Sequence, residues 1–121
     1  MRTRSSEQED YLLRIIRQAA EALRRLREIL TSSAAASPSV RAEVHDAVGQ
    51  LLGPDAALLS RLDAETAVRL LGDHVRAGLW ADLLDLDAAA SVAGGDEIAA
   101  TTQRTRAAAL RAAAARGDEN L

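Results

Sequence analysis

The chain of 121 residues contains no cysteine, no phenylalanine and no lysine, and only one tryptophan and one tyrosine. The absence of cysteine excludes disulfides, thiolate metal ligands and a cysteine nucleophile. Because aromatic residues are so scarce, the volume of a core has to come from Leu, Ile, Val and Ala, which suits closely spaced helices. All fifteen basic residues are arginine, as in a high-GC bacterial coding bias, so we do not read the preference for Arg as bidentate ligand recognition.

Long apolar runs are also absent. No run approaches the ~18 residues that a membrane-spanning helix requires. The basic N-terminal residues 1–6 are followed by Glu7, Glu9 and Asp10 instead of the apolar core of a signal peptide. We therefore expect a cytoplasmic protein with no membrane partner. The length fits one domain over residues 1–121 that buries about two thirds of its unfolded surface.

The net charge of −3 is unevenly distributed. Residues 1–39 carry seven arginines against five carboxylates, residues 40–97 carry four against eleven, and residues 98–121 carry four against two. Two basic ends thus flank an acidic middle. This arrangement could assist self-association or the docking of an oppositely charged partner. Alternatively, the charged side chains are simply solvated and have no role in binding.

The strongest pattern is a heptad-like seam of apolar residues in the first thirty positions. It predicts a long amphipathic helix over residues 6–31, which begins at a capping box of Ser6 and Glu9. With its flanking residues, the apolar stripe is wider than a two-stranded coiled coil requires, so we expect this helix to pack mainly on several helices of its own domain. The seam and its flank consist of Leu12, Ile16, Ala19, Leu23, Leu26 and Leu30, with Ile15, Ala22 and Ile29.

The remaining chain reads as further helices separated by clear breaks. A linker over 32–37 precedes central helices over 38–92, an Ala-rich helix over 96–116 and a tail over 117–121. The last helix is expected to pack on its predecessor over residues 98–110 and to fray beyond about residue 112. Since no stretch alternates like a strand, the fold class is all-α, with five to six antiparallel helices.

Two resemblances accompany this pattern. The turn at Gly94-Gly95-Asp96 and the late Ala109-Leu110 make residues 79–110 similar to one tetratricopeptide-type helical hairpin. The stretch from Tyr11 to Ile16 resembles the Tyr-apolar-apolar-Arg-x-Ile opening helix of a family of small bacterial all-helical proteins. That family ends in a tetratricopeptide-like hairpin. The resemblance implies a helical-hairpin array but no activity, because the family has no established one.

Candidate chemical sites are few. His45 and His74 lack the i, i+3 or i+4 partners that a helical metal site needs. Asp82 and Asp85 share a helical face and Asp87 points away from it, which we interpret as the solvated acidic edge of an amphipathic helix. No nucleophile elbow or phosphate-binding loop is present. We therefore expect no catalytic, cofactor-binding or metal-binding residues, and no enzyme.

Nucleic-acid binding is not expected either. The arginines of the first helix mostly have an acidic residue one turn away, and the protein is acidic overall. Arginine side chains arranged in this way do not form the continuous positive stripe that tracks a phosphate backbone.

The sequence favours a non-catalytic helical module that binds a protein or peptide, or a second copy of itself as a homodimer. The alternative is a small-molecule-binding or regulatory domain with a pocket between the first and fifth helices near Trp80. A third hypothesis, an enzyme that uses Asp82 and Asp85, has less support. The candidate interaction surface consists of Leu12, Ile16, Leu23, Leu26, Leu30 and Trp80.

Overall fold

The computed structural model describes residues 4–119, which are almost entirely helical and contain no strand. This confirms the all-α fold of five to six helices. Two short 3-10 turns, Ala34–Ala36 and Gly53–Asp55, connect helices. The α-helices of the described range are α1 (Arg4–Ser32), α2 (Ser37–Leu52), α3 (Ala56–Arg61), α4 (Ala64–Leu71), α5 (His74–Ala93) and α6 (Glu97–Glu119).

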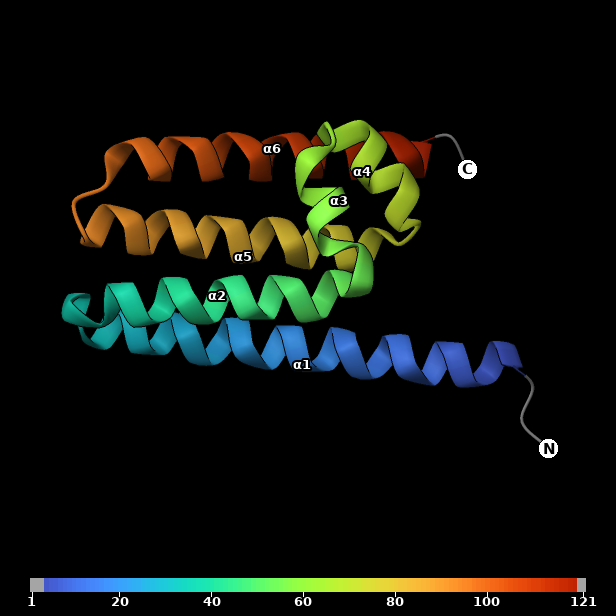
Figure 1. The fold of residues 1–121 in the computed structure, drawn as a ribbon, viewed down its shortest axis with the longest axis horizontal. Helices are drawn as coiled ribbons and strands as arrows, with labels where there is room; N and C mark the ends of the chain where they lie inside the picture. The colour runs from blue at the N-terminus through green and yellow to red at the C-terminus, as the bar shows by residue number, and fades with distance from the viewer. Residues whose placement is uncertain (1–3, 120–121) are drawn as a thin grey trace.

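Four long helices lie side by side, and the short helices α3 and α4 cross one end of them (Figure 1). Consecutive long helices run antiparallel, in the spatial order α1, α2, α5, α6 (Figure 1). Helix α5 is central, since it packs most extensively on α6 and also contacts α1, α2 and α4. Buried residues therefore occur on most sides of α5, and this helix supplies a large part of the core.

Helix boundaries follow local signals. The carboxylates of Asp63, Asp73 and Asp96 accept hydrogen bonds from backbone N–H groups three residues later, at the starts of α4, α5 and α6. Gly72 ends α4 in the left-handed region, with φ of 70°. Asp55 precedes α3 but makes no side-chain capping bond.

Three boundaries differ from the sequence prediction. Helix α1 begins at Arg4, so Ser6 lies within the helix and is not its cap. The predicted linker over 32–37 shortens to Ser33 and the turn Ala34–Ala36. Helix α6 continues to Glu119, beyond the predicted end at 116, and the rest of the predicted tail lies outside the described residues. The expected fraying beyond residue 112 is wrong, because Ala113 is buried against the core.

Small residues allow α6 to approach its neighbours closely. Ala100, Ala107 and Leu110 are fully buried along it. Ile98, one of the two large apolar residues of α6, is instead 84% exposed. The packing of α6 on α5 thus depends on alanine contacts and one leucine, with little apolar area per residue.

In the described part of the chain, none of the helices has both the length and the apolar composition required to cross a membrane.

Candidate functional site

Helices α2 and α6 both pack on α5 and leave a groove of about 650 Å³ between them. Its walls come from Arg41, Val44 and Val48 of α2 and from Gln103 and Arg106 of α6, and α5 supplies its floor. The volume falls within the roughly 300–1,000 Å³ typical of small-molecule sites. The groove is therefore large enough to hold a small organic molecule.

Trp80 lines this groove together with Leu84. The indole is 2% exposed, so it contributes to the core as well as to the site. A pocket near Trp80 was predicted between the first and fifth helices. The structure places it instead between α2, α5 and α6, and no residue of α1 lines it.

Asp87 joins the three helices of the groove. Its carboxylate accepts hydrogen bonds from Nε of Arg41 at 3.2 Å and from Nε2 of Gln103 at 3.0 Å. Asp87 is only 6% exposed. The prediction of a solvated acidic edge is thus wrong for this residue, whose negative charge is compensated by Arg41 inside the fold.

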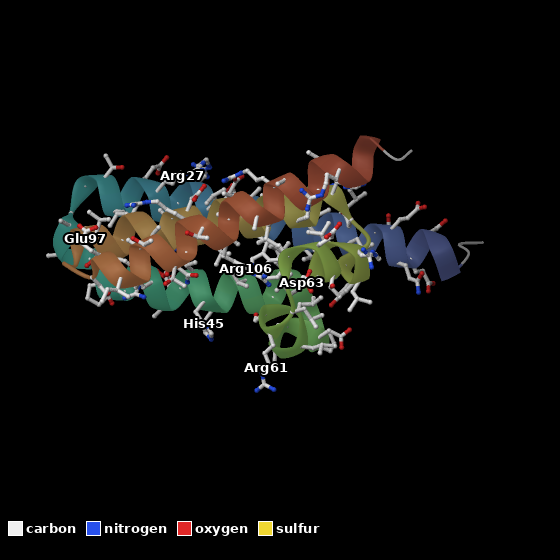
Figure 2. All side chains as sticks on the ribbon, turned by 90° about the horizontal axis from the view of Figure 1, so that it is seen from above. Arg27, His45, Arg61, Asp63, Glu97 and Arg106 are labelled. Carbon is white, nitrogen blue, oxygen red and sulfur yellow. The ribbon has the colours of Figure 1, made fainter. Side chains whose placement is uncertain are left out.

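Arg106 lies over Trp80, with its guanidinium carbon 5.2 Å from the centre of the ring. Its Nη2 donates a hydrogen bond to the backbone oxygen of Leu59 at 3.1 Å. Figure 2 shows its side chain near Asp63, on the side of α6 next to α4. Burial lowers the pKa of Arg106, and the negative charge of Asp63 offsets part of that effect.

Asp82 and Asp85 do share one face of α5, as the sequence predicted. Both bind Nη2 of Arg111, at 2.7 and 2.6 Å, and so tie α5 to α6. A guanidinium thus occupies the space between the two carboxylates. This contact identifies Asp82 and Asp85 as an interhelical ion-pair cluster.

The two histidines lie on different helices. His45 lies at the rim of the groove and points away from the bundle (Figure 2). His74 begins α5 near Gly117 of α6. Among the described residues, no group of three or more His, Asp or Glu side chains is arranged to hold a metal ion.

The candidate interaction residues divide into two groups. Leu23, Leu26 and Trp80 are buried in the core and are not accessible to a partner, whereas Leu12, Ile16 and Leu30 are only partly covered. The N-terminal part of α1 extends beyond the end of α2 (Figure 1). In the N-terminal half of α1, Tyr11 is 55% and Leu13 is 51% exposed.

Sequence reasoning missed Arg41, Gln103 and Arg106 as site residues. One signal was available for Asp87, which lies one helical turn from Leu83, Leu84 and Ala90 and thus on an apolar face. No comparable local signal marks the other residues, since their positions in the groove depend on how α2, α5 and α6 pack.

Comparison with known protein families, curated proteins and solved structures found no match to this chain.

Proposed function

We propose that the protein is a cytoplasmic, non-catalytic helical module that self-associates through the N-terminal end of α1. The observation that carries this proposal is the exposure of Tyr11 and Leu13 in the N-terminal half of α1, a helix whose N-terminal end extends beyond α2 (Figure 1). The two side chains lie on either side of the partly covered Leu12, and such exposed apolar surface on a protruding element is typical of an interaction site.

The apolar stripe of α1 continues towards the N-terminal end of this helix. Ile15 and Ala19 are buried against the body, and Leu12 and Ile16, on the same side of the helix, are only partly covered. Each Å² of apolar surface removed from water contributes about 25 cal/mol. A partner that covers this end of α1 therefore gains free energy without any rearrangement of the core.

The order of charges favours a second copy of the chain as that partner. Glu7, Glu9 and Asp10 precede the apolar residues, and Arg14 and Arg17 follow them. In an antiparallel pair of α1 ends, the acidic turn of each copy lies beside the two arginines of the other. Such a pairing is self-complementary, as a two-fold symmetric interface requires.

The α5–α6 hairpin supports an interaction role in a second way. Two long antiparallel helices joined by Gly94, Gly95 and Asp96 have the arrangement of the tetratricopeptide-type hairpin that residues 79–110 resemble.

The test is sedimentation of the full chain over a range of concentrations. We expect the wild-type protein to form a dimer and the double variant Tyr11→Glu/Leu13→Glu to be a monomer with unchanged helical circular dichroism. The matched control is Leu58→Glu/Leu70→Glu, which introduces the same charges at exposed leucines of α3 and α4. This control should remain dimeric.

Two results would contradict the proposal. One is a wild-type protein that stays monomeric at every concentration. The other is a dimer that survives Tyr11→Glu/Leu13→Glu, whether or not Leu58→Glu/Leu70→Glu also dimerises.

A further inference from the structure

We propose that the groove over Trp80 binds a small molecule with a single carboxylate and an apolar body, and that Arg106 is the counter-ion of that carboxylate. This inference is independent of self-association, because the groove lies between α2, α5 and α6 and contains no residue of α1.

Of the two arginines that line the groove, only Arg41 forms an ion pair with a carboxylate of the described residues. Arg41 is matched by Asp87 at 3.2 Å and by Asp96 at 3.7 Å. Arg106, in contrast, forms no ion pair with any carboxylate of the described residues. Asp63 acts on it only at longer range and uses its own carboxylate to cap α4.

The guanidinium of Arg106 is held in place for such a ligand. One of its faces is directed at the indole of Trp80, and Nη2 is fixed by the backbone oxygen of Leu59. An arginine has five N–H donors in a planar fork, and these two contacts use only part of that capacity. The remaining donors suit a carboxylate, which arginine binds through parallel hydrogen bonds.

Burial adds a reason for an anion at this position. The pKa of Arg106 is lowered because the surroundings disfavour its charge. A bound carboxylate would replace the favourable interaction with water that the guanidinium of Arg106 loses when it is buried.

The lining defines the rest of the ligand. Val44, Val48 and Leu84 supply apolar surface, and the volume of about 650 Å³ admits a small organic molecule. A phosphate dianion fits the groove less well, because one free arginine neutralises one negative charge and Asp87 lies in the same groove. The site therefore favours a monocarboxylate over a phosphorylated compound.

Trp80 is the only tryptophan of the chain, so its fluorescence reports on this groove alone. We expect butyrate, hexanoate or benzoate at millimolar concentrations to change that fluorescence saturably, with the same affinity by calorimetry. The corresponding neutral amides should bind at least about tenfold more weakly, because they lack the charge that Arg106 recognises. Inorganic phosphate at the same concentration should have no effect.

Variants on α6 locate the site. Arg106→Gln should reduce carboxylate affinity at least about tenfold by calorimetry, and Arg106→Lys should bind with intermediate affinity because it keeps the charge but not the fork. The matched control is Arg104→Gln, an exposed arginine of the same helix, which should bind like the wild type. Circular dichroism verifies that each variant is folded.

The proposal is overturned if no carboxylate of the series binds, if the amides or phosphate bind as well as the carboxylates, or if Arg106→Gln retains full affinity. The variant Tyr11→Glu/Leu13→Glu should bind carboxylates normally. This result separates a failure of the ligand site from a failure of self-association.

Discussion

Arg41 of α2 donates a hydrogen bond from Nε to the buried carboxylate of Asp87 on α5, over 3.2 Å. Gln103 of α6 donates to the other oxygen of the same carboxylate at 3.0 Å. One acidic side chain thus links the three helices that form the groove. Both of its oxygens have a partner, which is what makes a buried charge tolerable in this position.

Removal of this carboxylate should destabilise the fold. We expect Asp87→Ala to lower the free energy of unfolding by about 1–3 kcal/mol, because Gln103 and the partly buried Arg41 lose their acceptor. The expected loss is smaller than for a fully buried ion pair because the side chain of Arg41 is 37% exposed to water. Urea denaturation followed by circular dichroism measures the loss.

Asp85→Ala is the matched control for this prediction, since Asp85 lies on the same helix and binds an exposed arginine. Its effect should stay below about 1 kcal/mol. Equal losses in the two variants would show that Asp87 stabilises the fold no more than a surface ion pair does.

The cap of α4 should make stability depend on pH. Hydrogen bonds from the side chain and the backbone N–H of Thr66 lower the pKa of Asp63. A lowered pKa stabilises the folded state above the pKa of the unfolded chain, about 3.9, and this contribution is lost as the pH falls through the folded value. Asp63→Ala should therefore be less stable than the wild type at neutral pH, and the difference should shrink below about pH 4.

The measurement is the urea midpoint of both proteins across this pH range. Asp55→Ala is the control, because Asp55 occupies a similar position before α3 without a capping bond, and it should have a smaller effect. A difference for Asp63→Ala that is constant down to the lowest pH would contradict the assigned role of the ionised carboxylate.

The close packing of α6 should not tolerate larger side chains. Ala107 is fully buried, so Ala107→Leu should destabilise the protein by about 1–3 kcal/mol through overpacking. The neighbouring Ala108 is exposed, and Ala108→Leu should change the free energy of unfolding by no more than about 0.5 kcal/mol. Thermal and urea unfolding of the two variants provide the test, and a stable Ala107→Leu protein would show that this interface is loosely packed.

Much of the secondary structure was predictable because it depends on neighbours in sequence. The seam from Leu12 to Leu30 indicated a long first helix, and the turn at Gly94-Gly95-Asp96 separates α5 from α6 as the sequence predicted. The end of α6 was misjudged because alanine-rich segments give little apolar pattern. In the structure, contacts with α4 and α5 bury Ala113, which the sequence pattern does not reveal.

The site was less predictable. Trp80 was identified from the sequence as a pocket residue, but its neighbours were assigned to the wrong helix. Asp82, Asp85 and Asp87 were treated as one acidic edge, yet Arg111 binds two of them and Arg41 with Gln103 binds the third. Each of these partners lies far away in sequence or on another helix.

By itself, the sequence determined that this chain is helical, that a turn at Gly94-Gly95-Asp96 separates its last two helices, and that apolar residues follow one side of α1. These features depend on propensity, capping and periodicity, which act within a few residues. Only the tertiary structure decided which part of that apolar side remains exposed and that Arg106 lines a groove and forms no ion pair with the carboxylates of residues 6–117. Those two features depend on where helices distant in sequence come to lie beside one another, and such placement results from packing of the whole core.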